Sequence, residues 1–323
     1  MRRRSFTGLM SAALVPAAWP AFGQGSYPDR PIRLVVPYPA GGVTDVIARV
    51  LADEVGKSLG QRVLVDNKPG AAGNVGSDMV AKSKPDGYTL LLALIGNTIS
   101  MSLYKDVRYD FQRDFAPILQ LTSSSNVLVV HPSVPVKSAK ELIDFVRERP
   151  GKLNYASTGN GTSTHLSGEL FKLATGLNIT HVPYRGGAPA QNDLIAGQVQ
   201  MMFDNTSVST PRIKDGALRA LATTGRVRNK ALPDLPTIVE VGYPDVVVEG
   251  WSGLVAPAGT PKEIVARLNE EFNKALQTPQ ARKMLEDTGS TLVGGTDEAS
   301  AELIDIETKK WARVVKEANI RVD

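Results

Sequence analysis

The residue types with the clearest potential for chemistry lie in two short segments, each at the expected start of a helix. The first segment follows an apolar run at residues 32–37 and precedes an amphipathic stretch at residues 46–59. A helix start leaves backbone N–H groups unpaired at the positive end of the helix dipole, so this junction favours binding of an anion. An ordinary strand-to-helix turn is the alternative interpretation. The candidate ligand-binding residues of this segment are Pro39, Ala40, Gly41, Gly42 and Thr44.

The second segment lies between an expected strand at residues 153–157 and an expected helix at residues 164–174. Simple capping of the helix explains one hydroxyl group, whereas this segment carries several hydroxyl groups together with two glycines. The pattern therefore indicates a second anion-binding loop. Its candidate residues are Thr158, Gly159, Gly161, Thr162 and Thr164.

Single positions near turns add further candidates. Gly73 belongs to a glycine-rich turn that opens a helix at residue 74, where it forms either another wall of the pocket or a turn with positive φ. Tyr184 offers a ligand a packing surface and a hydrogen-bond donor, and Arg185 offers a bidentate partner for a carboxylate. A solvent-exposed turn is the alternative for both residues.

Two more candidates follow apolar strands. Asp204 ends an expected strand, where its carboxylate could bind a ligand ammonium or a water molecule; capping of the next helix is the favoured interpretation. Asn97 follows the expected strand at residues 88–94 and is a candidate for contact with the distal part of the ligand. Ligands of open α/β sheets bind beyond the ends of such strands.

Composition restricts the chemistry that these residues can perform. The chain has no cysteine and three histidines, His131, His165 and His181, none of them spaced as a pair of metal ligands. We therefore expect no cofactor, metal centre or thiolate site. Binding without catalysis is the leading hypothesis. The alternative is a secreted α/β enzyme that acts on a small organic acid through His165, Asp204 and Tyr184.

The N-terminus has the pattern of an export signal. Three arginines at positions 2–4 precede an apolar stretch that ends near Phe22, and small residues predict cleavage after Gly23. General secretion and twin-arginine export are both open. Removing three arginines from a chain with a formal net charge of +4 leaves a nearly neutral protein, so nucleic acid is not an expected partner. We expect the mature chain outside the cytoplasm.

The order of the expected elements predicts an α/β fold. Strand-like and helix-like segments alternate along the mature chain, which is typical of parallel-rich sheets with helices on both faces. Apolar runs at residues 115–121 and 127–130 predict two strands on either side of a polar segment at residues 122–126, where we expect the chain to cross into a second lobe. The expected boundaries are residues 24–124 with 249–323 for lobe 1 and residues 125–248 for lobe 2.

Motifs along the chain resemble those of the tripartite tricarboxylate transporter receptors, also called Bug-type solute-binding proteins. The resemblance covers essentially the whole mature chain, and it is specific because the motifs occur together. The matching segments are residues 27–37 (YPDRPIRLVVP), 67–73 (NKPGAAG), 87–91 (GYTLL), 159–162 (GNGT), 181–186 (HVPYRG), 232–237 (LPDLPT) and 256–261 (APAGTP).

The resemblance implies a periplasmic receptor with the two-lobed Venus-flytrap fold of type II binding proteins and two hinge crossings. Such receptors capture a small carboxylate (a di- or tricarboxylate, an amino acid or an aromatic acid) and deliver it to the permease of a tripartite tricarboxylate-type transporter. In the family, backbone groups and bridging water in two loops hold the carboxylate, and these loops fall here at residues 39–44 and 158–164. We expect a monomer. A ligand-sensing partner of a sensor kinase is a further alternative.

Overall fold

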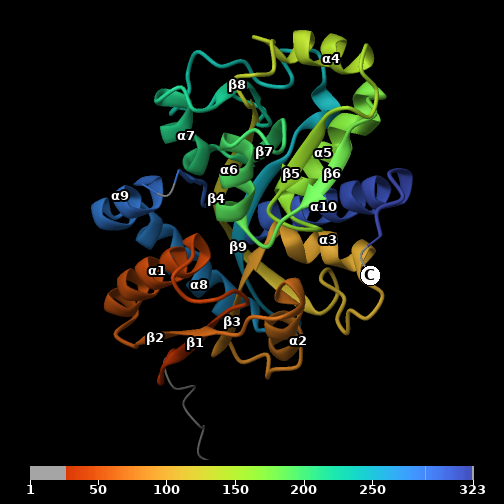
Figure 1. The fold of residues 1–323 in the computed structure, drawn as a ribbon. Coiled ribbons are helices and arrows are strands. Elements are labelled where there is room, and N and C mark those ends of the chain that lie inside the picture. The colour runs from red at the N-terminus through yellow and green to blue at the C-terminus, as the bar shows by residue number, and fades with distance from the viewer. Residues whose placement is uncertain (1–26, 288, 322–323) are drawn as a thin grey trace, which may run out of the picture.

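Two lobes joined by long strands make up the fold of the computed structural model, which describes residues 27–287 and 289–321 (Figure 1). The expected α/β class and two-lobed architecture are confirmed, whereas the expected signal segment, residues 1–23, lies outside the described residues. The strands are β1 (Ile32–Val36), β2 (Val63–Asn67), β3 (Thr89–Leu94), β4 (Phe115–Val130), β5 (Asn154–Ser157), β6 (Thr180–Pro183), β7 (Met201–Asn205), β8 (Arg219–Thr223), β9 (Glu249–Pro257) and β10 (Thr291–Leu292).

Helices follow most of the strands. The α-helices are α1 (Val43–Leu59), α2 (Asn74–Ala81), α3 (Ile95–Leu103), α4 (Ala139–Arg147), α5 (Ser163–Thr175), α6 (Gly187–Ile195), α7 (Thr206–Lys214), α8 (Lys262–Gln277), α9 (Pro279–Asp287) and α10 (Asp297–Glu317). Two short 3₁₀ helices are η1 (Ala71–Gly73) and η2 (Pro244–Val246). Within the described part of the chain, no helix combines the length and the apolar character that crossing a membrane requires.

The strands form a continuous sheet in the order β2-β1-β3-β9-β4-β7-β5-β6, and β8 and β10 also pair with β4. The outer strands are parallel, since β1 pairs with β2 and β3, and β5 pairs with β6 and β7. The central strands β4 and β9 are antiparallel to each other and to their neighbours. The sheet is therefore parallel in each βα-rich part and antiparallel where the two parts join.

Strand β4 runs through both parts of the sheet. It pairs with β9 as far as Ser125 opposite Glu249, and it pairs with β7 and β8 from Asn126 and Val127 onward. The predicted division into two strands around residues 122–126 is therefore wrong, because residues 122–125 pair with β9 and Asn126 pairs with β7 within one continuous strand. The expected lobe boundaries, at residues 124/125 and 248/249, stay a prediction that this change of strand partners supports.

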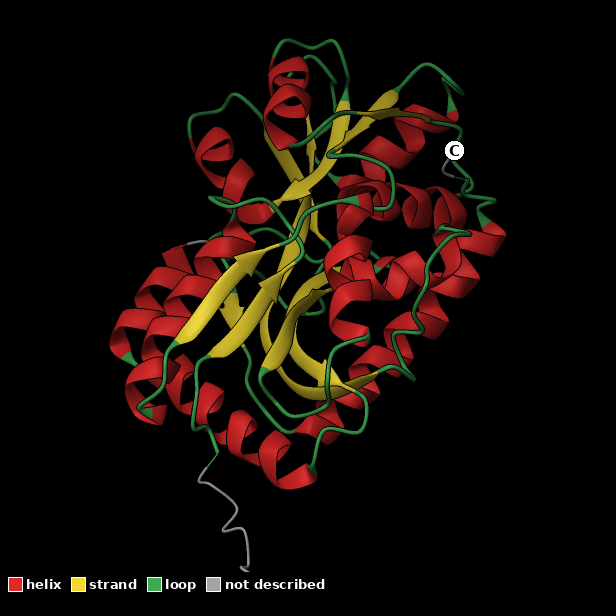
Figure 2. Cartoon of the chain, turned by 90° about the horizontal axis from the view of Figure 1, so that it is seen from below, coloured by secondary structure: helices red, strands yellow, loops and turns green. Residues whose placement is uncertain are grey.

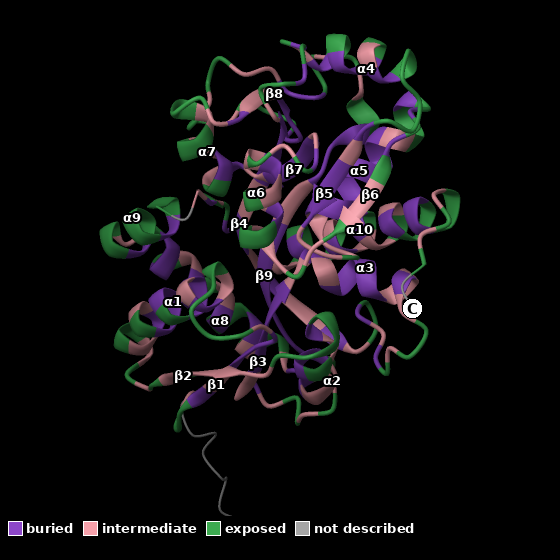
Figure 3. Ribbon diagram, viewed as in Figure 1, coloured by how far each residue is buried: buried purple, intermediate pink, exposed green. Residues whose placement is uncertain are grey.

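Helices cover both faces of the sheet (Figure 2), and most of the apolar residues of the strands are buried (Figure 3). Leu34 and Leu90 belong to a buried cluster with residues of α1 and α8, whereas Val35 and Leu91, the next residues along the same strands, belong to a cluster with residues of α2, α3 and α10. Successive side chains of a strand point to opposite faces, which explains this division. The second cluster continues through α10, which also packs against β4 and α5.

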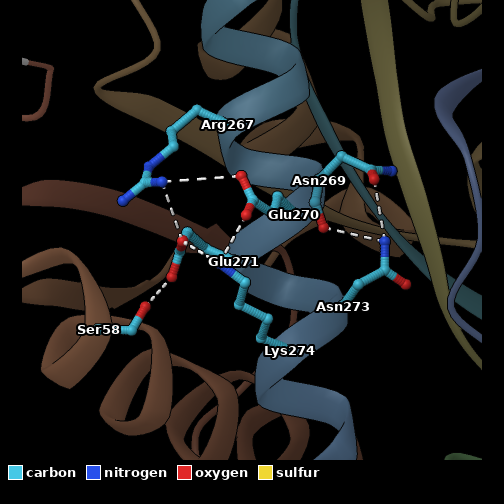
Figure 4. A network of polar contacts seen from close by, with 7 residues as sticks. All are labelled: Ser58, Arg267, Asn269, Glu270, Glu271, Asn273 and Lys274. Atoms are coloured by element: carbon cyan, nitrogen blue, oxygen red, sulfur yellow. Dashed lines mark hydrogen bonds and ion pairs between the residues drawn. The ribbon is translucent and has the colours of Figure 1, made fainter.

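A polar network fixes the C-terminal part of α1 to α8 (Figure 4). Buried Glu271 of α8 accepts a hydrogen bond from Ser58 of α1, and it lies 3.3 Å from Arg267 and 3.1 Å from Lys274. A buried carboxylate is costly without such partners, so the network stabilises one packing of α1 against α8. The hydrogen bond from Ser58 is the contact in this network that joins α1 to α8.

Candidate ligand-binding cleft

A cavity of about 440 Å³ lies where the starts of several helices meet the central strands. This volume is in the usual range for sites that bind small molecules. Residues of α1, α3, β4 and β9 line it from one part of the chain, and residues 158 and 160–163 with Asn205 line it from the other, whereas the predicted Gly159 lies outside the lining. None of the described residues that line the cavity carries a charged side chain. Its wall is made of hydroxyl and carboxamide groups, backbone and apolar side chains.

The start of α1 forms the first wall. Its N-cap, Gly42, provides no side-chain cap, so the first-turn N–H groups of Val43 and Thr44 have no acceptor within the helix. Val43 and Thr44 line the cavity, as predicted for Thr44 alone. The other candidates of this loop are exposed and lie outside the lining: Pro39, Ala40, Gly41 and Gly42.

Asp45 holds the loop before α1 in place. Its carboxylate accepts hydrogen bonds from the Gly41 N–H at 3.0 Å, from Arg49 at 2.9 Å and from Asn67 at 3.0 Å. The hydrogen bond from Arg49 is the main reason that the pKa of Asp45 falls to about 2. The Gly41 amide is therefore bonded inside the protein, and the free N–H groups that face the cavity come from α1 itself.

The loop before α5 forms the opposite wall. Thr158, Gly161 and Thr162 line the cavity, and Thr162 is the N-cap of α5, accepting a hydrogen bond from the His165 N–H. The buried Thr164 hydroxyl lies 3.0 Å from the Thr158 hydroxyl and 2.9 Å from the Thr162 hydroxyl, and it accepts a hydrogen bond from the Thr158 N–H. Thr164 therefore organises the loop from within instead of lining the cavity.

Two stacked histidines support this loop from behind. The ring centroids of His165 and His181 are 4.1 Å apart, and His165 Nδ1 accepts a hydrogen bond from the Gly161 N–H at 3.2 Å. His181 Nε2 lies 2.7 Å from the hydroxyl of Ser157, which also accepts a hydrogen bond from the Gly159 N–H. Burial lowers the pKa of His165 to about 4 and that of His181 to about 3, so both rings are neutral at pH 7.

Helix α3 forms a third wall that the sequence pattern did not predict. Leu94, Ile95 and Gly96 line the cavity at its start, and Ser100 and Tyr104 line it farther along. The first-turn N–H groups of this helix add a third positive helix end to those of α1 and α5. Burial raises the pKa of the Tyr104 phenol, which is therefore neutral at pH 7.

The central strands form the floor of the cavity. Thr122 and Ser124 of β4 lie there with Trp251 and Ser252 of β9. The hydroxyl groups of Thr122 and Ser252 are 2.6 Å apart and bond to each other. The indole N–H of Trp251 is buried and has no acceptor among the described residues. The floor thus offers uncharged polar groups beside an aromatic ring.

A family model described as the tripartite tricarboxylate transporter family receptor matches residues 47–320. This chain belongs to that receptor family. A similar protein is Protein BugT of Bordetella pertussis (strain Tohama I). It is 38% identical to this chain over 299 residues, and the match covers 92% of this chain and 92% of BugT.

Solved structures similar to this family member cover nearly its whole length. One is R. palustris Rpa4515 with adipate, at 37% identity and a TM-score of 0.78, covering 91% of this chain and 99% of that chain. Another is MatC (Rpa3494) from Rhodopseudomonas palustris with bound malate, at 33% identity and a TM-score of 0.76, covering 90% of this chain and 100% of that chain.

Two predicted residues of this family member lie behind the cavity wall. Asn97 is buried; its side chain accepts a hydrogen bond from a backbone N–H at 2.9 Å and donates one to Ser77 at 2.8 Å, which fixes the start of α3. Gly73 is covered by Tyr38, because a Cβ at Gly73 would come within 3.4 Å of the Tyr38 hydroxyl. Its neighbour Ala72 lines the cavity instead.

Three predicted residues after α5 also lie outside the lining of the receptor's cavity. Tyr184 donates a hydrogen bond to Asp193 at 2.7 Å, and Arg185 is exposed. Asp204 is buried and accepts hydrogen bonds from Ser209 and from a glutamine side chain, both at 2.7 Å. Burial raises the pKa of Asp204. These partners give the Tyr184 and Asp204 side chains structural roles.

Many of the wall residues that the sequence pattern missed come from α3, β4 and β9. Apolar residues spaced four apart, Ile95, Ile99 and Leu103, are a helical signal that would have predicted α3. A run of hydroxyl residues at 122–125 between two apolar runs would have indicated one strand with a polar surface. No local signal marks Trp251 as part of a site, because only the pairing of β9 with β4 brings it to the floor.

Proposed function

We propose that this protein is an extracytoplasmic solute-binding receptor that captures a small carboxylate between its lobes and delivers it, unchanged, to the permease of a tripartite tricarboxylate-type transporter. The observation that carries the proposal is the cavity itself. The N-termini of α1, α3 and α5 meet there, and its described lining holds no charged side chain.

The positive potential of the cavity comes from helix ends. Unpaired N–H groups and the helix dipoles favour a negative group at each of these starts. An acidic side chain that would hold an ammonium group is absent from the described lining. The site therefore favours an organic anion over an amine.

The solved relatives support a carboxylate as the ligand. Rpa4515 is recorded with adipate and MatC with malate, and both are more than 30% identical to this chain over most of its length. Transfer of this ligand class to the present chain is part of the proposal, as are its periplasmic location, its monomeric state and its permease partner.

The rival enzyme hypothesis finds no assembled catalytic group among the described residues. His165 bonds to the loop before α5, Tyr184 to Asp193, and Asp204 to Ser209, so no hydrogen bond joins any two of the three. A nucleophile or a general base needs a partner within hydrogen-bond reach. We therefore propose binding without catalysis.

The experiment is calorimetric titration of the purified mature protein with monocarboxylates, dicarboxylates, tricarboxylates, aromatic acids and amino acids. We expect at least one acid to bind with a 1:1 stoichiometry and to be recovered intact by mass spectrometry. Ser124→Phe, which fills the floor, should abolish binding, whereas Lys140→Phe on the exposed side of α4 should not. Absence of binding across the panel, or conversion of the acid, would contradict the proposal.

A further inference from the structure

Three stacked rings lie behind the loop before α5. Tyr155 of β5 and His181 of β6 are opposite each other in the parallel pairing of these strands, and their ring centroids are 4.8 Å apart. His165, in the first turn of α5, also stacks on His181, at 4.1 Å. Tyr155 and His165 are buried. The position of the His165 ring is therefore fixed by the strands and the helix of the lobe.

His165 is joined to the loop by two hydrogen bonds. Its backbone N–H donates to the Thr162 hydroxyl at 3.4 Å, and its ring nitrogen Nδ1 accepts from the Gly161 N–H at 3.2 Å. This exchange is similar to a capping box, in which a glutamate or glutamine at the third helical position accepts a hydrogen bond from an amide at the helix start. Here an imidazole takes the place of that side chain.

The hydrogen bond from Gly161 to His165 requires a neutral ring. An imidazole nitrogen accepts a hydrogen bond only while it carries no proton, and both nitrogens of an imidazolium are donors. A proton on Nδ1 would face the Gly161 N–H and replace an attraction by a repulsion. The contact is therefore lost when His165 takes up a proton.

The position of Gly161 matters to the cavity because this residue lies against α3. Gly161 lines the cavity, and a Cβ there would lie 2.6 Å from a Leu103 methyl group and 3.6 Å from the Tyr104 hydroxyl. Thr158 and Thr162, before and after it in the loop, line the same wall. Movement of Gly161 away from His165 would therefore displace the wall that these residues share.

The surroundings of His165 keep its ring neutral at pH 7. Burial lowers its pKa to about 4, and burial also keeps the stacked His181 neutral. Two charges on α5 act on His165 in opposite directions, because Lys172 disfavours a proton on the ring and Glu169 favours it. These two side chains form an ion pair at 2.9 Å, and the Tyr155 hydroxyl donates a hydrogen bond to Glu169.

Charged groups on the other elements packed around α5 have other surroundings. Asp204 of β7 bonds to side chains of α6 and α7, and Asp245 of η2 is exposed. The buried carboxylate of α10, Glu307, pairs within its own helix. Strands β4, β5 and β6 contain no aspartate, glutamate, lysine or arginine. The charges that act on His165 are therefore those of its own helix.

We propose that His165 is a positioning residue for ligand binding: its neutral ring is the acceptor that holds Gly161 in the cavity wall, and a proton on that ring releases the loop and the bound acid. This inference rests on the proposed function, in which the loop before α5 holds one side of the acid. His165 does not line the cavity, so it acts through Gly161.

Two substitutions separate the acceptor from the bulk of the ring. His165→Asn keeps an acceptor, because the amide oxygen of asparagine is as many bonds from the backbone as Nδ1, and it does not titrate. His165→Leu fills similar space without an acceptor. In calorimetry at pH 7 with the tightest-binding acid of the panel, we expect His165→Leu to bind about tenfold more weakly than His165→Asn.

The matched control is the pair His131→Asn and His131→Leu. His131 lies outside the cavity lining, and its ring bonds to Ser133. These two variants should bind the acid with the same affinity.

The pH profile is a readout that a merely structural histidine would not change. The ratio of the affinities of the parent and His165→Asn at one pH cancels the protonation of the acid itself. Because the pKa of His165 is about 4, we expect this ratio to fall below its value at pH 7 by about twofold at pH 4 and about fourfold at pH 3.5. Circular dichroism at each pH verifies that both proteins are folded.

A measurement without ligand separates this inference from the proposed function. In ligand-free protein labelled with nitrogen-15 glycine, the NMR signal of the Gly161 amide is assigned from its absence in Gly161→Ala. We expect this signal to shift as the pH falls through 4 in the parent and to stay nearly constant in His165→Asn.

The outcomes separate the two proposals. An unresponsive Gly161 signal, equal affinities of His165→Leu and His165→Asn, or an affinity ratio that is constant with pH would overturn the positioning role while leaving acid binding intact. If no acid of the panel binds to the parent, the proposed function fails, and the Gly161 signal alone then decides whether His165 holds the loop.

Discussion

At the scale of single residues, Asp45 organises the first loop of the cleft without lining it. A carboxylate in the first turn of α1 interacts favourably with the helix dipole. Here it also accepts hydrogen bonds from Gly41, Arg49 and Asn67. These donors explain why an acidic residue is compatible with a neighbouring anion site. Its charge is already compensated inside the protein.

Asp45→Asn tests this role through stability. Because the pKa of Asp45 is low in the folded protein, its contribution to the free energy of unfolding is complete above its ordinary pKa near 4 and is lost as the pH falls toward 2. We expect the substitution to lower the free energy of unfolding by about 1–2 kcal/mol at pH 7, with the difference from the parent shrinking between pH 4 and pH 2. Urea unfolding followed by tryptophan fluorescence at several pH values measures it.

Asp53→Asn is the control on the same helix. Asp53 is exposed and pairs only with Lys57, so the substitution should change the free energy of unfolding little. Equal effects of the two substitutions, or an Asp45 effect that persists at pH 2, would contradict the role assigned to Asp45.

The sequence placed residues on the cavity wall where the position of the backbone, and not that of the side chain, decides the contact with the cavity. Residues at helix starts face the cavity because the strand–turn–helix order places them there, and those on the wall are Thr44, Thr158, Gly161 and Thr162. Tyr184 and Asp204 were candidates by type, but partners on the helices that follow them, Asp193 of α6 and Ser209 of α7, fix their side chains elsewhere. Sequence spacing does not contain that information.

At the scale of elements, the cleft depends on the contact between α3 and the loop before α5. Gly161 lies so close to α3 that a Cβ would come within 2.6 Å of a Leu103 methyl group. Its φ of +74° also favours glycine. The loop can therefore approach α3 only because this residue has no side chain.

Gly161→Ala tests this close approach, and Gly41→Ala is its matched control. Both glycines have positive φ, so each substitution should cost about 1–2 kcal/mol of unfolding free energy. Only Gly161→Ala adds a clash, since nothing lies within 4 Å of a Cβ at Gly41. We expect Gly161→Ala to weaken acid binding about tenfold and Gly41→Ala to change it little, measured by calorimetry.

A result in which both alanine variants bind the acid equally well would show that the contact with Leu103 is not needed for binding. Equal weakening by both would instead place Gly41 nearer to the ligand than its exposed position indicates.

At the scale of the whole molecule, β4 and β9 are the connection on which any closing motion depends. They pair with each other up to the Ser125–Glu249 pair, after which β4 changes its partners. Lobes joined by so few strands can rotate as rigid bodies about a hinge, and a ligand held by helix starts of both lobes favours the closed form.

Ligand-driven closure can be measured by fluorescence energy transfer, because the native chain has no cysteine to interfere with labelling. Dyes on Asp53→Cys in α1 and Lys140→Cys in α4, both exposed positions, report the distance between the lobes. We expect saturating acid to narrow the distribution of transfer efficiencies and to shorten the distance between the two dyes. An unchanged distribution at saturation would contradict closure.

The overall fold was predictable because the alternation of strands and helices repeats along the chain, and the helix starts followed from it. The central crossing was predicted at the right segment of the chain but with the wrong local structure. The hydroxyl residues at 122–125 were interpreted as a break between two strands, whereas pairing with β9, more than a hundred residues away, makes them part of one strand. Long-range pairing of this kind is invisible to local periodicity.

The most direct test of the central claim is a crystal structure of the mature protein grown with the tightest-binding acid of the panel. The account predicts a carboxylate between the starts of α1 and α5, with its oxygens within hydrogen-bond distance of first-turn N–H groups of both helices. An acid bound in another cavity, or one held by a charged side chain with these N–H groups left free, would contradict it.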